Sequence, residues 1–94
     1  MEYKMKIQHQ DDHQRGEFFI LNEQGVKIAE LTYFYEAENK INANHTFVSN
    51  QLRGQGIADK LYQALLAFIT KNQLELHPTC SYIERKWERS NNKK

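Results

Sequence analysis

The stretch Arg53-Gly54-Gln55-Gly56-Ile57-Ala58 divides this chain of 94 residues into two parts that follow different hydrophobic periods. Before it, short runs of β-branched and aromatic residues are separated by polar turns, which is typical of strands. After it, apolar residues recur at every third or fourth position, which is typical of a helix that buries one face. The chain is therefore expected to build a small sheet and then cover it with a helix that begins at the glycine turn.

The first part of the chain predicts four strands joined by short turns. We expect the strands at residues 5–8, 17–21, 26–35 and 41–48, and the turns at residues 22–25 and 36–39 are short enough for antiparallel hairpins. In the third strand one face carries Ala29, Leu31, Tyr33 and Tyr35, and the other carries Val26, Ile28, Glu30, Thr32 and Phe34. One of the two faces should meet the helix.

The second part predicts a helix, a strand and a second helix. We expect the first helix at residues 57–72, the strand at 74–77, the second helix at 82–89 and a frayed tail at 90–94. An antiparallel meander that continues as β-α-β-α predicts an α+β fold with a mostly antiparallel sheet. A chain of this length is expected to form one domain, over residues 1–94.

The glycine turn is a candidate phosphate-binding site. The first N–H groups of a helix lack partners within it, and glycine lets a phosphate approach them and permits a positive φ. Residues 1–52 hold five Lys and Arg against eight Asp and Glu, whereas residues 53–94 hold eight against four. The positive half begins at the turn, which suits a small polyanion, although basic residues also gather in solvated tails. The imbalance is too weak to predict nucleic-acid binding.

The composition limits the cellular compartments and the metal or disulfide chemistry that we expect of this protein. No apolar run reaches the roughly 18 residues of a membrane span, and the first four residues lack the apolar core of a secretory signal. We therefore expect a cytoplasmic protein without a membrane partner. The single cysteine, Cys80, cannot form an internal disulfide, and no Cys or His pair has zinc-ligand spacing. His9 and His13 are expected in a solvated loop, so no metal is predicted.

Motifs along the chain resemble those of a known superfamily. Arg53, Gly56 and Ala58 match the signature Arg or Gln, two residues, Gly, one residue, Gly or Ala, placed between a strand and an amphipathic helix. In this the chain resembles the GNAT superfamily of acyl-CoA N-acyltransferases. Residues 18–89 resemble more narrowly a subfamily of very short, single-domain, acetyl-CoA-binding GNAT-like proteins. The motifs of that second resemblance are His45-Thr46-x-Val48, Leu52-Arg53-Gly54-Gln55-Gly56 and Pro78-x-Cys80-x-Tyr82.

The resemblance implies acetyl-CoA as co-substrate. It implies that Phe47 and Val48 pair through their backbone with pantetheine, like an added strand. Ordinary GNAT domains carry helices after the first strand that help to build the acceptor pocket, and here residues 14–16 leave no room for them. The acceptor is therefore not predicted, and a homodimer that completes the pocket is an alternative to a monomer. The amides implied to hold the pyrophosphate of coenzyme A are those of Arg53, Gly54, Gln55, Gly56, Ile57 and Ala58.

Cys80, His45 and Tyr82 are the candidate catalytic residues. Cys80 follows the last strand, close to where the resemblance implies the thioester, and is either a nucleophile with His45 as its base or a small apolar filler. Period-2 counting with Ile41 and Ala43 places His45 on the apolar face, where a structural histidine is the alternative. Tyr82 matches the position of a tyrosine acid in GNAT enzymes, or packs its ring at the helix start.

Three functions follow from these candidates. The preferred one is an acetyltransferase that moves an acetyl group from acetyl-CoA to an unknown amine or protein acceptor, directly or through Cys80. The second is a non-catalytic module that senses or carries acetyl-CoA. The third is a small interaction domain whose glycine turn binds no ligand.

Overall fold

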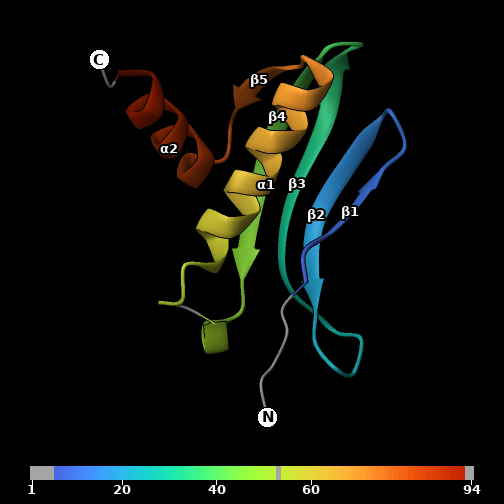
Figure 1. Cartoon of the computed structure of the whole chain (residues 1–94), viewed down its shortest axis with the longest axis vertical. Helices are drawn as coiled ribbons and strands as arrows, with labels where there is room; N and C mark the ends of the chain where they lie inside the picture. Colours follow the sequence, from blue (N-terminus) through green and yellow to red (C-terminus); the bar gives the residue numbers. More distant parts are fainter. Residues whose placement is uncertain (1–5, 53, 93–94) are drawn as a thin grey trace.

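The computed structural model describes residues 6–52 and 54–92, with side chains through residue 89. These residues form one five-stranded sheet, two α-helices and a short 3-10 helix (Figure 1). The elements in chain order are β1 (Gln8–Asp11), β2 (Arg15–Leu21), β3 (Lys27–Ala37), β4 (Lys40–Val48), η1 (Asn50–Leu52), α1 (Ile57–Asn72), β5 (Glu75–Pro78) and α2 (Ser81–Asn92). The α+β prediction is confirmed, and α1 has the predicted bounds.

The order of the strands in the sheet follows their order in the chain. β1, β2, β3 and β4 pair antiparallel with their neighbours, and β5 pairs parallel with β4. A parallel pair needs a crossover connection, which α1 supplies. In Figure 1 α1 lies across one face of the sheet, and α2 lies to its side, next to β5.

The first predicted hairpin turn is closed by an asparagine side chain. Asn22 Oδ1 accepts hydrogen bonds from the backbone N–H groups of Gln24 and Val26, each at 2.9 Å, and Gly25 takes a φ of 82°. Asn and Gly are the residues that such local acceptors and positive φ angles require. The turn lies between β2 and β3, as the sequence predicts.

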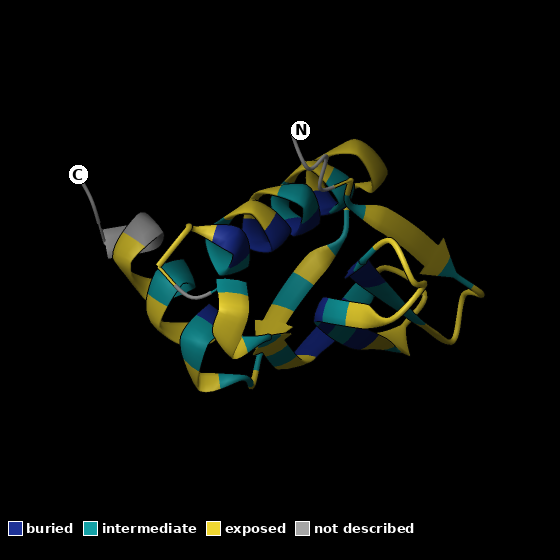
Figure 2. Ribbon diagram, turned by 90° about the horizontal axis from the view of Figure 1, so that it is seen from below, coloured by how far each residue is buried: buried dark blue, intermediate teal, exposed yellow. Residues whose placement is uncertain are grey.

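The core lies between α1 and one face of the sheet, where Figure 2 shows the buried residues concentrated. Ala29, Leu31 and Tyr33 of β3 are buried, whereas Phe34, which lies on the other face of the strand, keeps 39% of its surface exposed. The alternation predicted for β3 is confirmed, and the face of Ala29 is the one that meets α1. The members of the core cluster are Phe18, Ile20, Ala29, Leu31, Tyr33, Ile41, Ala43, Ile57, Leu61, Tyr62, Leu65, Ile69 and Ile83.

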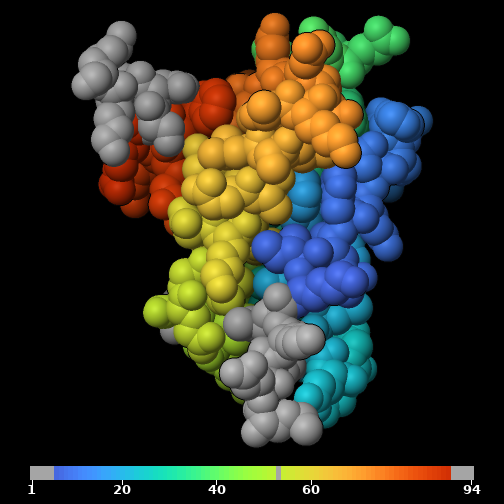
Figure 3. Space-filling model, viewed as in Figure 1, coloured from blue at the N-terminus to red at the C-terminus, as the bar shows by residue number. Residues whose placement is uncertain are grey.

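β1 lies three residues later than the sequence predicts, and His9 belongs to this strand rather than to a solvated loop. The ring of His9 stacks on Phe18 with centroids 4.1 Å apart and meets the edge of Phe68 at 4.6 Å. Figure 3 shows the blue atoms of this part of the chain directly against those of α1. The prediction was wrong because the strand contains no apolar residue and is held by ring stacking and hydrogen bonds. His13 does lie in the turn that follows, with a φ of 71°.

A β-bulge in β4 reverses the direction of its side chains. Thr32 of β3 pairs with His45, but the next residue of β3 pairs with Ala43, so Asn44 is the extra residue. Ile41 and Ala43 are buried, whereas the side chain of His45 is 52% exposed. The prediction that His45 shares the apolar face of Ile41 and Ala43 was therefore wrong, because simple alternation fails across the extra residue.

The last helix is longer than predicted. α2 begins at Ser81 and continues to Asn92, whereas the sequence predicted a helix at residues 82–89 and fraying beyond it. Neither Gly nor Pro interrupts the chain between these positions, so no strong stop signal ends the helix earlier. Of the predicted frayed tail, residues 93–94 lie outside the described part of the chain.

Candidate active site

β4 and β5 separate at the bulge, and this leaves one edge of β4 open. β5 pairs with residues 40–43 of β4, after which the backbone N–H groups of Thr79 and Cys80 both donate to the Ala43 carbonyl at 3.0 Å. Residues 45–48 of β4 pair with β3 on one side, and no described strand pairs with them on the other. An unpaired strand edge offers N–H and C=O groups to an extended partner. The predicted pantetheine residues Phe47 and Val48 lie on this edge.

The glycine turn leads into α1 as the sequence predicts. Gly54 and Gly56 take φ angles of 85° and 72°, and Gly56 is the N-cap, which offers no side-chain acceptor to the first turn of α1. A Cβ atom would meet nothing within 4 Å at either glycine, so the positive φ alone requires glycine in the protein without ligand. Gly54, Gln55 and Gly56 are exposed, whereas Ile57 is buried and Ala58 is half-buried. The first-turn amides of α1, including those of Ile57 and Ala58, lack partners within the helix.

Gln55 and Arg53 also belong to the predicted phosphate site. The backbone N–H of Gln55 donates to the Leu52 carbonyl at 3.3 Å, so this amide is engaged within the loop. Arg53 lies outside the described residues, and its predicted role is not tested. The positive charge that the structure does place nearby is Lys86 of α2, whose Nζ lies 2.7 Å from Asp59 Oδ1 in the first turn of α1.

Cys80 is half-buried and contacts the residue after His45 rather than His45 itself. Its thiol donates to Thr46 Oγ1 at 3.4 Å. Thr46 pairs with the buried Leu31 and therefore points to the α1 side of the sheet, whereas His45 points to the other side, where its Nε2 lies 3.2 Å from Glu30. The structure does not bring His45 to Cys80 as a base. Sequence analysis overlooked Thr46 as the thiol's partner, although the His45-Thr46 motif contains it.

Tyr82 lies in the first turn of α2, close to Cys80 in space as well as in sequence. Burial raises the pKa of Tyr82, and the neighbouring ammonium of Lys86 opposes this shift. The phenol also interacts electrostatically with the Cys80 thiol and the phenol of Tyr62. Two of the three predicted catalytic residues, Cys80 and Tyr82, are therefore brought together.

A hydrogen-bonded network holds the chain just before Cys80. Buried Asn42 donates from Nδ2 to Glu36 Oε2 at 2.7 Å and accepts from Thr79 Oγ1 at 2.5 Å. His77 Nδ1 lies 2.8 Å from the same Glu36 oxygen. Hydrogen bonds from Asn42 and His77 lower the pKa of Glu36 below its ordinary value. Sequence analysis missed this network, because its members come from three strands and have no common motif.

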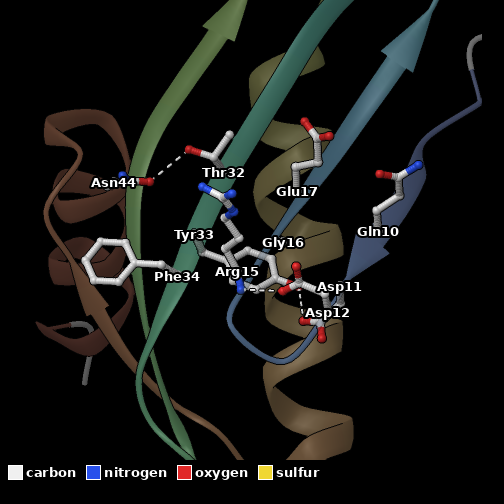
Figure 4. A pocket seen from close by; sticks show the side chains of 10 residues that line it. All are labelled: Gln10, Asp11, Asp12, Arg15, Gly16, Glu17, Thr32, Tyr33, Phe34 and Asn44. Carbon is white, nitrogen blue, oxygen red and sulfur yellow. Dashed lines mark hydrogen bonds between the residues drawn. The ribbon is translucent and has the colours of Figure 1, made fainter.

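A pocket of about 730 Å³ opens on the face of the sheet opposite α1. Figure 4 shows Arg15, Glu17 and Thr32 in front of the strands, with α1 behind them. Thr32 Oγ1 donates to Asn44 Oδ1 at 2.8 Å, so the bulge residue of β4 forms one wall of the pocket. The lining residues are Gln10, Asp11, Asp12, Arg15, Gly16, Glu17, Thr32, Tyr33, Phe34 and Asn44.

Within residues 6–52 and 54–92, no three His, Cys, Asp or Glu side chains gather as they would around a metal ion. In the same ranges no helix has the length and apolar character needed to cross a membrane.

The sequence matches the family model described as GCN5-related N-acetyl-transferase over residues 17–94. It is 33% identical over 85 residues to Protein NATD1 of Gallus gallus, which covers 90% of this chain and 77% of that protein. Protein NATD1 of Homo sapiens is 32% identical over 81 residues, covering 86% of this chain and 70% of the relative.

Solved structures agree with these matches. A GCN5-like protein from Staphylococcus aureus superimposes with a TM-score of 0.71 at 31% identity, over 92% of this chain and 80% of that one. The ribosomal-protein-alanine N-acetyltransferase of Brucella melitensis gives a TM-score of 0.64 at 16% identity, over 84% of this chain and 64% of that one, and this shows a shared fold alone. From the family model, the relatives above 30% identity and the fold, the chain belongs to the GCN5-related N-acetyltransferase family.

Proposed function

We propose that the protein binds acetyl-CoA along the open edge of β4 and transfers its acetyl group to an amine. The observation that supports this most is the separation of β4 from β5 at Asn44. The open edge runs from Val48, near the glycine turn, to the bulge, where Ala43 holds the backbone of Cys80. An extended pantetheine arm can pair with such an edge as an added strand does.

The residues at the start of α1 suit the pyrophosphate of acetyl-CoA. The helix N-terminus has no side-chain cap, and its two glycines leave the approach to the amides clear. Backbone N–H groups and the helix dipole favour an anion at such a position. Lys86 adds a cation beside this turn, because its contact with Asp59 brings α2 to the start of α1. Asp59 balances the charge of Lys86 in this pair, so the attraction for an anion comes from the backbone N–H groups and the helix dipole.

Acetyl transfer to an amine requires one bond to form and one to break. The amine nitrogen bonds to the thioester carbon and loses a proton, the carbon–sulfur bond breaks, and the sulfur gains a proton. We infer that Tyr82 donates that proton, because its phenol, whose pKa burial raises, is protonated at neutral pH and Tyr82 follows Cys80 by two residues. The acceptor amine approaches from the pocket on the open sheet face, which reaches Asn44 at the bulge.

The contacts of Cys80 favour direct transfer over a covalent cysteine intermediate. Its thiol donates to the neutral hydroxyl of Thr46, and among the described side chains no imidazole or carboxylate contacts it. The lack of a base beside Cys80 among the described residues also supports a second candidate function. In this alternative the protein is a module that binds acetyl-CoA without turnover.

The test is a calorimetric titration of the protein with acetyl-CoA and with free CoA, followed by intact-mass analysis. We expect both ligands to bind and the protein mass to stay unchanged, with acetylated product appearing when a panel of primary amines is added. Cys80→Ala is the matched variant, and it should retain binding and transfer.

Each other outcome has a definite meaning. A mass increase of one acetyl group that disappears in Cys80→Ala would establish the covalent route instead. Binding without any product over a broad amine panel would favour the non-catalytic module. Failure of acetyl-CoA and CoA to bind would overturn the proposed function.

A further inference from the structure

The hydroxyl group of Tyr62 is buried and has no hydrogen-bond partner among the described residues. Tyr62 lies on the inner side of α1, and the residue keeps only 2% of its surface exposed. It is the only buried side-chain polar atom in the described part of the chain that lacks a partner. The sequence places Tyr62 beside the apolar stripe of α1, where phenylalanine would fill the same space without a polar group.

The phenols of buried Tyr33 and half-buried Tyr35 have hydrogen-bond partners. The hydroxyl groups of Tyr33 and Tyr35 both donate to Asp11 Oδ2, at 2.6 and 2.8 Å. Burying a hydroxyl group without a partner costs free energy, and such groups are rare in native structures. A lone exception beside a candidate site indicates a partner that the protein alone does not contain.

Tyr62 is related in position to both ends of the candidate site, the glycine turn and Cys80. It follows Gly56 by six residues, which places it about 9 Å further along the helix axis than the glycine turn. At the other end, Cys80 and Tyr82 pack against the core cluster that contains Tyr62, and the charges of Tyr62 and Cys80 both contribute to the raised pKa of Tyr82. Tyr62 therefore belongs to the packed region that also holds the half-buried thiol.

We propose that the Tyr62 hydroxyl donates a hydrogen bond to a carbonyl oxygen of a bound acyl-pantetheine arm. This rests on the proposed function, because the arm is the part of acetyl-CoA that would pass between the glycine turn and Cys80. The arm presents amide and thioester carbonyls, which are acceptors, and the phenol is a donor that lacks an acceptor. Tyr62 is thus a ligand-positioning residue that holds the arm from the α1 side, opposite the strand edge.

Tyr62→Phe tests this assignment, because it removes the hydroxyl group and keeps the ring. Without ligand, the melting temperature should stay the same or rise, since an unsatisfied polar atom has been removed. The affinity for acetyl-CoA should fall about five- to tenfold, the effect of one lost hydrogen bond. ADP, which carries a pyrophosphate but no arm, serves as the control ligand, and any affinity for it should be unchanged by the substitution.

Tyr35→Phe is the matched protein variant, since it removes a phenol that already has a partner. It should lower the melting temperature and leave acetyl-CoA affinity unchanged. If Tyr62→Phe binds acetyl-CoA as tightly as the parent, or melts at a lower temperature without ligand, the assignment is wrong and the proposed function stands. If the parent protein itself does not bind acetyl-CoA, the proposed function and this assignment both fail.

Discussion

Tyr33 of β3 donates a 2.6 Å hydrogen bond to Asp11 of β1 and so connects two strands that are not neighbours in the sheet. Its ring crosses β2 at Gly16, where an added Cβ would overlap the Tyr33 hydroxyl and lie 2.6 Å from the carbonyl oxygen of Gln10. Because the phenol donates its proton to Asp11, His9 Nε2, 2.7 Å away, is the donor in its contact with the Tyr33 oxygen. One side chain therefore fixes the position of β1 and the tautomer of His9.

We predict that Gly16→Ala lowers the free energy of unfolding by about 2 kcal/mol, because the methyl group and the Tyr33 ring compete for the same space. Urea denaturation measures the loss. Gly25→Ala is the control, since its Cβ meets nothing within 4 Å and only the φ of 82° is strained, at about 1 kcal/mol. Equal losses in the two variants would contradict the crossing of Tyr33 over Gly16.

Acidification should destabilise the protein in two steps. Burial lowers the pKa of His9 below its ordinary value of 6.5, although Asp11 opposes this shift. The unfolded chain then binds the proton more readily, so stability is full above pH 6.5 and declines as the pH falls from there toward the folded pKa. His9→Phe keeps a ring over Phe18 and should remove this first step. Urea midpoints measured from pH 8 to pH 5 make the comparison.

The second step belongs to Asp11. Burial raises the pKa of this carboxyl, but the hydrogen bonds from Tyr33, Tyr35 and the backbone N–H of His13, together with the charge of His13, bring it below 3.8. Stability from this group is present above pH 3.8 and is lost as the pH falls through the folded pKa. Asp11→Asn should lose about 2 kcal/mol at neutral pH and show no decline of this kind. A variant as stable as the parent would contradict the role of the carboxylate.

We predict that Gly56→Ala reduces acetyl-CoA affinity at least tenfold, because a methyl group at the N-cap obstructs the helix amides and opposes the φ of 72°. Stability should fall by about 1 kcal/mol from the backbone strain alone. Calorimetry and thermal melting separate the two effects. The Gly25→Ala variant described above has a comparable strain in the turn between β2 and β3 and should bind normally.

Asn42→Ala should destabilise the protein by about 2 kcal/mol, since it leaves Glu36 and Thr79 without a shared buried partner. Asn44→Ala removes an exposed asparagine with a single bond to Thr32 and should cost no more than about 0.5 kcal/mol. Chemical denaturation of both variants tests the contrast. Similar values for the two would show that the network before Cys80 contributes no more than a surface contact.

The parts of the fold that the sequence predicts are those in which local pattern and burial agree. α1 has a glycine turn at its start and an apolar stripe along its length, and its bounds match. The faces of β3 alternate regularly, and its buried residues match. β1 has no apolar period, and its place depends on Tyr33, which lies more than twenty residues away, so the local sequence contains no signal for it.

The candidate site was predicted only in part, for a similar reason. The glycine turn and the proximity of Cys80 to Tyr82 depend on short motifs. The side of the sheet on which His45 lies depends on an extra residue in β4, and Asn44 carries no local mark of that role. The sequence does not predict that the Tyr62 hydroxyl lacks a hydrogen-bond partner, because this depends on how the side chains pack.

The extra residue at Asn44 also affects how the length of β4 relates to its two faces. A substitution in β4 changes one side chain, whereas deletion of Asn44 would remove the bulge and leave His45 opposite Thr32 and Thr46 opposite Leu31, on the faces that they occupy now. Simple alternation along the shortened strand would then predict the side of the sheet on which His45 lies. A length difference at this position therefore changes the count of residues in β4 without changing the chemistry of either face, so alignments of such short chains are best anchored on the bulge.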